Sequence, residues 1–370
     1  MDTDLLIIIS LFAFALALIV FAYTLTARSR RRIVQDIRPH RADHNPILSP
    51  SAHSDWEEQA SFNPTATLDD EGRIHLFYRA IGADGISRIG HAISSDGLHF
   101  HTRSPYPVYQ PIPGYGLPEK SLKNGPHHYD IEIHPSGGGW GGAEDPRTTR
   151  IGDRVYMTYT AFEGWENMRI GLTSISLADL KNRRWKWKRP RLISPANARA
   201  KNWVIFPEKI NGKYAILHSV APTVLIEYVD SLDMIPNICS SKDHGGYGTC
   251  DKNREEFWDK TMKGAGAPPL KTDAGWLLLY HAIDENKYKV GAMILDINDP
   301  SHVIYRSPTP ILSPDAQYEN DGKPGVVYAT GAVIKGDTLF IYYGGGDKHV
   351  CVAEIPLRDM LSWLIEYGKV

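Results

Sequence analysis

The sequence has little cysteine and no excess of charge of either sign, and both shortages exclude classes of protein. Its 370 residues include three cysteines, too few for the disulfide framework of a small secreted domain. Its 41 basic and 43 acidic side chains leave a net charge of -2, whereas a nucleic-acid-binding protein usually carries a basic domain or stripe. We therefore expect no disulfide-stapled module and no nucleic-acid partner.

The cysteines also argue against a metal site. Cys239 and Cys250 lie in one long loop with His244 between them, but a zinc site built on these three lacks a convincing fourth ligand. The two thiols would pair only in an oxidising compartment, so their pairing stays open. Cys351 lies in an apolar strand, where we expect it in the core. The sequence thus predicts no bound metal.

Aromatic residues, glycine and proline are plentiful. Trp, Tyr and Phe make up 10% of the chain, which also has 32 glycines and 25 prolines, a composition typical of β-rich, turn-rich proteins. The length exceeds that of most single domains, although all-β folds often run this long as one unit.

One long hydrophobic run interrupts this pattern at the start of the chain. Residues 5–23 carry no charge, and 19 residues are about enough to cross the ~30 Å hydrocarbon core as a helix. A signal peptide would have a basic residue ahead of the run, but Asp2 and Asp4 stand there. The arginines follow the run, which favours a cytoplasmic location for what comes next, although they would also suit contact with anionic lipid. The sequence therefore predicts a transmembrane anchor at 1–27, a basic juxtamembrane linker at 28–44 and a single-pass membrane protein whose catalytic domain faces the cytoplasm.

Internal repeats organise the remainder. Five related strand patterns begin at positions 73, 154, 213, 275 and 338. Each follows a turn and is preceded by another apolar run, so each repeat contains a hairpin. A third strand follows in several repeats, and a proline-bordered fourth suits an outer edge, which can spare a backbone donor. Four strands in each of five units predict an all-β, five-bladed β-propeller over residues 45–370, with a helix over 357–367 on its flank. A β-sandwich would not explain five similar units.

The densest concentration of reactive groups lies between Gly137 and Arg150. Glu144 and Asp145 precede Pro146, whose ring restricts the residue before it to extended conformations, and Arg147 adds a permanently charged fork. A surface turn would use the same Glu-Asp-Pro sequence. We interpret the stretch as the active site.

Other polar residues stand where the innermost strands of the repeats begin or where the next strands end. They are Asn63, Arg79, Glu208, Lys209, His281 and Asp347. Innermost strands of a propeller surround its axis, so we expect these side chains to meet Glu144 and Asp145 in one pocket. Unpaired buried charge is expensive, and carboxylates that hold a proton are the usual tools for cleaving glycosidic bonds. Aromatic faces for sugar rings would come from Tyr115, Trp140, Trp165 or Trp203.

Seven motifs together resemble glycoside hydrolase family 130. They are Asn63–Ala66, Phe77–Ala80, Gly142–Arg147, Phe206–Tyr214, Gly264–Pro269, Leu279–Ala282 and Tyr342–Asp347, in the order and spacing of that family, and the match runs from about residue 45 to the C-terminus. The resemblance implies a five-bladed propeller and one of two activities, inverting β-mannoside phosphorolysis or β-1,2-mannoside hydrolysis.

The resemblance also implies roles for individual residues. Asp145 is the general acid, delivering its proton through the 3-hydroxyl of the mannosyl unit while phosphate attacks the anomeric carbon from the opposite face. The mannose-containing oligosaccharide would be bound, or Asp145 braced, by Asn63, Arg79, Glu144, Arg147 and Asp347. Phosphate would be bound by Lys201, Asn202 and His281. No cofactor is implied beyond inorganic phosphate as co-substrate.

The chain departs from the family pattern at Ser219, where the phosphorylases typically have arginine. One charge-assisted contact to phosphate is therefore missing. We expect phosphorolysis, which is favoured by the predicted cytoplasmic location, where phosphate is abundant, and by the surviving Lys201, Asn202 and His281. Hydrolysis, with Glu208 as base, is the alternative and is favoured by the lost arginine. A sugar-binding propeller without catalysis is a third reading, since a fold does not establish an activity. The linkage, the acceptor sugar and the oligomeric state stay open.

Overall fold

The computed structural model describes residues 36–370 apart from 118–126, 197–198 and 236–253. Contacts divide the chain into two units, 1–36 and 37–370, and nearly all described residues belong to the second. The loop with Cys239, His244 and Cys250 lies outside the described residues, whereas Cys351 is buried, as expected.

Five consecutive β units make up residues 37–370. The first contains β2 (Ala60–Leu68), β3 (Ile74–Ile81), β4 (Ile86–Ser94) and β5 (Thr102–Arg103), and the second contains β6 (Gly141–Ile151), β7 (Arg154–Phe162), β8 (Met168–Ser176) and β9 (Arg191–Leu192). The third contains β10 (Val204–Ile205), β11 (Tyr214–Ser219) and β12 (Leu225–Val229). The fourth contains β13 (Thr261–Ala265), β14 (Leu270–Thr272), β15 (Gly275–Asp284), β16 (Lys287–Leu295) and β17 (Val303–Arg306). The fifth contains β18 (Val327–Lys335), β19 (Thr338–Gly345) and β20 (His349–Pro356).

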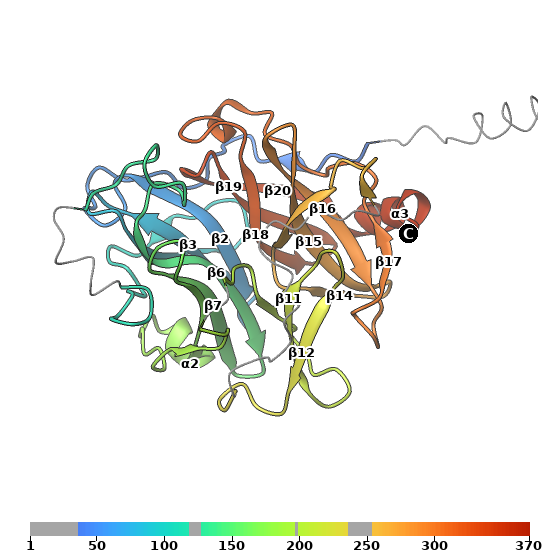
Figure 1. Ribbon diagram of the computed structural model, residues 1–370, viewed down its shortest axis with the longest axis horizontal. Helices are drawn as coiled ribbons and strands as arrows, with labels where there is room; N and C mark the ends of the chain where they lie inside the picture. Colours follow the sequence, from blue (N-terminus) through green and yellow to red (C-terminus); the bar gives the residue numbers. More distant parts are fainter. Residues whose placement is uncertain (1–35, 118–126, 197–198, 236–253) are drawn as a thin grey trace, which may run out of the picture. The chain divides into compact units, whose positions relative to one another are not determined.

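The prediction of five four-stranded blades is wrong. The strands form four sheets, because a short parallel pairing of β4 with β6, Ile86 to Gly141 and Ser87 to Gly142, joins the first two units into one eight-stranded sheet. Within the described residues, which omit 236–253, the third unit has three strands. The last sheet is completed from the other end of the chain, since β1 (His40–Arg41) pairs with β20. Figure 1 shows β18 between β2 and the β15–β16 hairpin, and β18 contacts all three strands.

The predicted membrane anchor, and the localisation that rests on it, also need correction. Within the described part of residues 36–370, no helix is both long and apolar enough to cross a membrane. The hydrophobic run at 5–23 lies outside the described residues. The domain boundary drawn at residue 45 stays a prediction, although β1 lies before it.

The part of the chain that the structure describes contains three short helices. They are α2 (Leu177–Lys181), the 3-10 helix η3 (Gln317–Glu319) and α3 (Leu357–Tyr367). The last is the helix predicted over 357–367, with Met360, Trp363 and Leu364 on its buried side. It packs against β16, β17 and β20.

A tyrosine lying over a glycine recurs in the hairpins and explains part of the repeat pattern. Tyr78 pairs with Gly90 across β3 and β4, and Tyr280 pairs with Gly291 across β15 and β16. A β-carbon added at Gly90 would lie 2.2 Å from the Tyr78 ring, and one at Gly291 would lie 2.3 Å from the Tyr280 ring. Only glycine leaves room for the buried ring over the neighbouring strand, which is a reason for glycine inside a strand.

The hydroxyl groups of these tyrosines join buried ion pairs. Tyr78 donates to Glu57 (2.9 Å), which also accepts from Arg103 (2.6 Å). The fourth unit repeats this with Tyr280, Asp259 and Arg306, at 2.7 Å and 2.6 Å. A buried carboxylate needs such partners because burying it alone is expensive, so each cluster fixes the outer part of its unit.

We expect Gly90→Ala to lower the free energy of unfolding by about 1–3 kcal/mol, the usual cost of overpacking a close-packed core. The new methyl group would push the Tyr78 ring and strain its hydrogen bond to Glu57. Urea denaturation followed by circular dichroism measures the change. An unchanged unfolding midpoint would show that the ring does not need this space.

The first strands of the units surround a common centre. Near one end of this centre, a cavity of about 310 Å³ is lined by residues of β2, β6, β14 and β18 together with Pro207, which follows β10. Several of these inner strands also contain a shift in pairing register, at Phe62/Thr65, Glu144/Arg147, Met262/Gly264 and Ala329/Gly331. A residue inserted in this way bends the strand and re-aims a side chain.

Candidate active site

A second cavity, of about 180 Å³, gathers polar side chains from all five units. It is lined by Asn63, Arg79, Pro135, Ser136, Gly137, Asp145, Trp165, Lys201, Tyr288, Lys323, Val326, Tyr328 and Asp347. Of the nine predicted site residues, Asn63, Arg79, Asp145, Lys201 and Asp347 line it directly. The other four do not line the cavity, but each contacts a lining residue through a hydrogen bond or a ring contact. They are Glu144, Arg147, Asn202 and His281.

The register shift in β6 sets the position of Asp145. Its φ is +50°, the left-handed region, and Asn63, Asn202 and Asp347 have φ of +47°, +64° and +50°. The expectation of an extended Asp145 is therefore wrong, because the inserted residue of the bulge overrides the preference that Pro146 imposes. Asp and Asn are the residues other than glycine that best tolerate this conformation, and such strain clusters at functional sites.

Asp145 is buried among groups that stabilise its charged form. Asn63 Nδ2 donates to its Oδ1 at 2.8 Å, and Arg79 Nη1 lies 3.5 Å from the same oxygen. Burial by itself would raise the pKa of Asp145, but the charges of Arg79, Lys201 and Arg147 and the hydrogen bond from Asn63 outweigh it and hold the pKa below its usual value. In the free site, Asp145 is therefore ionised at neutral pH.

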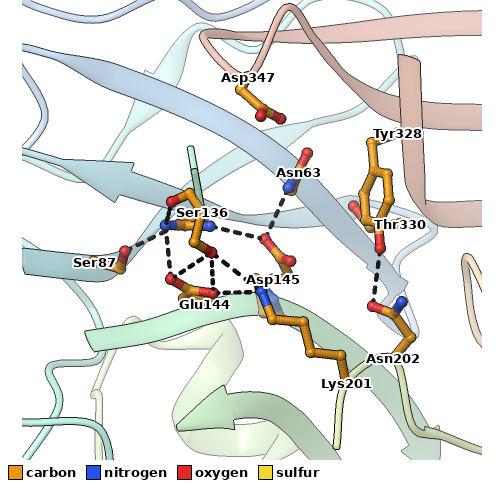
Figure 2. A network of polar contacts seen from close by, with 12 residues as sticks. Asn63, Ser87, Ser136, Glu144, Asp145, Lys201, Asn202, Tyr328, Thr330 and Asp347 are labelled. Carbon is orange, nitrogen blue, oxygen red and sulfur yellow. Dashed lines mark hydrogen bonds and ion pairs between the residues drawn. The ribbon is translucent and has the colours of Figure 1, made fainter. Parts of the chain in front are cut away.

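Glu144 precedes Asp145 on β6, contacts the same Arg79 side chain and holds two cations. Its side chain is 0% exposed. It accepts from Arg79 Nη2 at 2.9 Å, from Lys201 Nζ at 2.9 Å and from Ser136 Oγ at 2.8 Å and 3.0 Å. Figure 2 shows contacts from Ser136 to both Glu144 and Lys201, and Lys201 Nζ donates to Ser136 Oγ at 3.1 Å. Glu144 therefore positions Arg79 and Lys201 for the cavity.

Among the described residues, no carboxylate side chain accepts a hydrogen bond from Arg147. Its Nε donates to the carbonyl of Gly266 at 2.6 Å, its Nη1 to the carbonyl of Asp145 at 2.7 Å, and its Nη2 to Asn202 Oδ1 at 3.1 Å. Arg147 thus fixes the backbone of the bulge that presents Asp145. The Asn202 oxygen also accepts from the Tyr328 hydroxyl at 3.1 Å, as Figure 2 shows.

His281 stacks on Tyr328 with ring centroids 3.7 Å apart. Its Nε2 lies 2.8 Å from the carbonyl of Ala329, so Nε2 carries the proton and donates. Burial and the charge of Arg147 lower the pKa of His281 to about 3, so the ring is neutral at neutral pH. Its Nδ1 is buried, and the described residues provide it with no hydrogen-bond partner.

Asp347 is the second carboxylate of the cavity, and its environment differs from that of Asp145. It follows Gly346 in the turn between β19 and β20, with Lys323 Nζ 3.6 Å from its Oδ2. Burial outweighs the effects of Lys323 and Arg79 and, with the charge of Asp145, raises the pKa of Asp347 above its usual value. The pKa values of the two carboxyl groups are therefore shifted in opposite directions, a separation typical of acid–base sites.

Several predicted site residues lie elsewhere. Glu208 is exposed and forms an ion pair with Lys271, a residue of the 310 Å³ cavity, and it does not line the cavity around Asp145. Trp203 is buried in an apolar cluster. Among the predicted aromatic residues, Trp165 lines the cavity, with Lys201 Nζ 5.2 Å from its ring centroid.

Sequence reasoning missed Ser136, Tyr328 and Lys323. Ser136 stands one residue ahead of the Gly137–Arg150 stretch, and this proximity is its only sequence signal. Tyr328 lies among the apolar residues of β18, and Lys323 follows a turn. No motif or spacing distinguishes either of them.

Comparison with known proteins shows the family to which the chain belongs. Residues 129–366 match the family model of glycoside hydrolase family 130, described as beta-1,4-mannooligosaccharide phosphorylase. A 1,2-beta-oligomannan phosphorylase of Thermoanaerobacter sp. (strain X514) is 37% identical over 336 residues, 88% of this chain and 99% of the relative. A beta-1,2-mannobiose phosphorylase of the same organism is 34% identical over 85% of this chain and 96% of its own length.

The chain is also similar in three dimensions to a solved phosphorylase structure. The beta-1,2-mannobiose phosphorylase of Listeria innocua, in complex with β-1,2-mannobiose, superposes with a TM-score of 0.66 at 26% identity, covering 88% of this chain and 99% of that one. The fold and the polar cavity thus define a carbohydrate-active enzyme. The chain belongs to glycoside hydrolase family 130, and it is a β-mannoside-cleaving enzyme of the glycoside phosphorylase and glycosidase class.

Proposed function

We propose that this enzyme cleaves β-1,2-linked mannosides by phosphorolysis, transferring the terminal mannosyl group to inorganic phosphate with inversion. The observation that supports this most directly is Asp145, a strained, buried carboxylate held by Asn63 and Arg79 in a cavity lined by all five units. The 1,2-linkage is taken from the phosphorylases that the chain resembles over nearly their whole length.

The reaction needs one proton and one nucleophile. A phosphate oxygen forms a bond to the anomeric carbon while the glycosidic C–O bond breaks on the opposite face. The departing oxygen receives a proton that originates on Asp145 and passes through the 3-hydroxyl of the mannosyl unit. The products are α-mannose 1-phosphate and a saccharide shortened by one mannose.

Asp145 must be protonated to act in this way, whereas in the free site its charged form is favoured. Binding of phosphate would change this, because a nearby negative charge disfavours a second one and raises the pKa of a carboxyl group. Burial behind bound sugar acts in the same direction. Phosphate would therefore act both as nucleophile and as the charge that keeps the proton on Asp145.

The residues around Asp145 suit a saccharide. Asn63 Oδ1 is buried and lacks a hydrogen-bond partner among the described residues, so it can accept from a sugar hydroxyl. Asp347 lines the same cavity, and its carboxylate oxygens can accept from sugar hydroxyl groups. Arg79, Glu144 and Arg147 brace Asp145 and the bulge that presents it.

Phosphate would bind beside Lys201, Asn202 and His281. Lys201 supplies an ammonium group at the wall of the cavity, and the amide of Asn202 lies between units three and four. The bare Nδ1 of His281 is an acceptor, which fits the P–OH group of hydrogen phosphate.

Hydrolysis by way of Glu208 is not supported by the geometry. Glu208 is exposed, paired with Lys271 and absent from the lining of the catalytic cavity. A water molecule between Asp145 and Asp347 would meet no other free carboxylate among the lining residues. We therefore favour phosphate over water as the nucleophile.

The experiment is to incubate the enzyme with β-1,2-mannobiose with and without inorganic phosphate and to follow products by ³¹P NMR and by free-mannose assay. We expect one mannose 1-phosphate per bond cleaved and negligible cleavage without phosphate. β-1,4-Mannobiose serves as the linkage control and should react more slowly. Release of two mannose molecules per mannobiose, independent of phosphate, would contradict phosphorolysis.

A further inference from the structure

Asp347 has a backbone conformation that needs support from its surroundings. It stands in the turn between β19 and β20 with a φ of +50°, directly after Gly346 at +59°. A residue other than glycine stays in this left-handed region only where the neighbouring structure holds it there. The ion pair of its own side chain, with Lys323 Nζ at 3.6 Å, is long. Whatever fixes this turn therefore decides where one carboxylate of the catalytic cavity lies.

The turn is bound to residues 321–326. Lys323 N donates to the carbonyl of Gly346 at 2.7 Å, and Gly346 N donates to the carbonyl of Val326 at 3.0 Å. The two backbones are in close contact, because a β-carbon added at Gly346 would lie 2.6 Å from a carbonyl oxygen of this segment. Both segments contribute to the cavity, which Lys323, Val326 and Asp347 line. A shift of either segment would therefore displace part of the cavity wall.

Three side chains outside the cavity lining connect the same two segments. His349, the first residue of β20, is buried. Its Nε2 lies 3.0 Å from Asp321 Oδ2, and its Nδ1 lies 3.0 Å from Ser49 Oγ. Hydrogen bonds from His349 and Lys348 lower the pKa of Asp321, so its carboxylate is ionised at neutral pH and accepts from Nε2. His349 thus joins the turn that it follows to the segment that Asp321 begins.

Ser49 provides a fixed point on the other side of His349. The residue before it, Leu48, pairs with Val350 in an antiparallel bridge, through backbone hydrogen bonds of 2.9 Å and 3.3 Å. The carbonyl of Ser49 also accepts from Arg103 Nη1 at 2.8 Å. The imidazole ring is therefore held from both sides, by Ser49 at Nδ1 and by the carboxylate at Nε2.

The same three side-chain types occur in serine hydrolases, but the arrangement here does not suit a nucleophile. In a hydrolytic triad, the serine contacts Nε2 of the histidine and a buried aspartate contacts Nδ1. Here the two nitrogens are exchanged, and the Asp321 side chain is 52% exposed. A connecting role explains the contacts better.

We propose that the hydrogen bonds of Ser49, His349 and Asp321 form a clamp that fixes the turn before β20. The clamp holds Asp347 in position for the mannosyl unit, and His349 is its positioning residue. The inference rests on the sugar-binding role proposed for Asp347 and names what supports that role. Because the clamp lies within the fifth unit and its neighbouring segment, loosening it should displace Asp347 and leave the phosphate-binding groups of the other units in place.

The test compares two amide substitutions at His349 by steady-state kinetics. Glutamine can place a donor where Nε2 stands and keep the contact with Asp321, whereas asparagine reaches only the position of Nδ1 and loses it. His349→Asn should raise the KM for β-1,2-mannobiose about three- to tenfold, the effect of one lost hydrogen bond, with the KM for phosphate nearly unchanged. His349→Gln should retain most of the wild-type KM. Asp321→Ala removes the same contact from the other side and should reproduce the effect of His349→Asn.

His99→Ala is the matched control. His99 and Asp96 form another histidine–aspartate pair, with Nδ1 2.8 Å from Oδ2, in the segment after β4, and neither residue is among those that line the cavity. This variant should leave both KM values unchanged. A double variant, His349→Asn with Asp321→Ala, should be no worse than either single one, because each change removes the same interaction.

Titration calorimetry with β-1,2-mannobiose alone, in the Asp145→Asn background, gives a second measurement that does not need turnover. We expect weaker mannobiose binding when His349→Asn is added and no change when His99→Ala is added. Unchanged binding with both His349→Asn and Asp321→Ala would overturn the clamp and leave phosphorolysis intact. A parallel rise of both KM values with a lower urea midpoint would also overturn it, because that result indicates a general loss of structure. Cleavage by the wild type that ignores phosphate would overturn phosphorolysis alone, and the binding measurement would still decide the inference about the clamp.

Discussion

Asp145→Asn should lower phosphorolysis of β-1,2-mannobiose by about 10²- to 10⁴-fold, the range usual for a general acid, while the protein stays folded. The amide is close in size to the carboxylate and can still contact Asn63 and Arg79, but it has no proton to transfer. The loss should depend on the leaving group. An aryl β-mannoside with a good leaving group needs less protonation in the transition state, so the variant should regain a larger share of wild-type rate with it.

Asp347→Asn is the matched control for this experiment. It makes the same chemical change in the other carboxylate of the cavity, whose raised pKa makes it the rival for the role of acid. If Asp347 binds sugar, its variant should raise the KM for mannobiose, and its loss of rate should be similar for good and poor leaving groups. A leaving-group dependence in Asp347→Asn rather than in Asp145→Asn would move the acid to Asp347.

Glu144→Gln should cost about 3–5 kcal/mol of unfolding free energy, the usual effect of breaking a buried ion pair by neutralising one partner. The glutamine can still accept from Ser136. However, Arg79 and Lys201 would then be buried beside a neutral group, and the nearest carboxylate left to Arg79 among the described residues would be Asp145, at 3.5 Å. Urea denaturation of both proteins at the same pH gives the difference.

Glu208→Gln provides the comparison on the surface. Glu208 and Lys271 also form an ion pair, but both side chains are about half exposed, and such pairs contribute roughly 0–1 kcal/mol. We expect the Glu208 variant to unfold almost as the wild type does. If the two substitutions lowered the free energy of unfolding equally, the buried ion pairs of Glu144 would contribute no more to stability than the exposed pair of Glu208.

Local patterns in the sequence were sufficient to place the repeating strands. The patterns beginning at positions 154, 275 and 338 start where β7, β15 and β19 start, and the helix over 357–367 has the predicted bounds. These features depend on alternation and periodicity within a few residues, which the chain carries wherever it folds. The division into sheets was not predictable in this way, because the β4–β6 and β1–β20 pairings join segments whose contact no local pattern encodes.

The sequence by itself determined that Asn63, Arg79, Asp145 and Asp347 are polar residues at comparable points of the repeat, and the structure brings these four to one cavity together with Lys201, which only the family resemblance had indicated. Only the tertiary structure decided what each one contacts. Glu208 occupies a similar place in the pattern yet reaches the surface, since a shift of a residue or two along a strand changes which way a side chain points. Likewise, the charge state of Asp145 depends on Arg79, Lys201 and Arg147, which come from three different units, and electrostatic interactions depend on distance in space and on burial rather than on position in the chain.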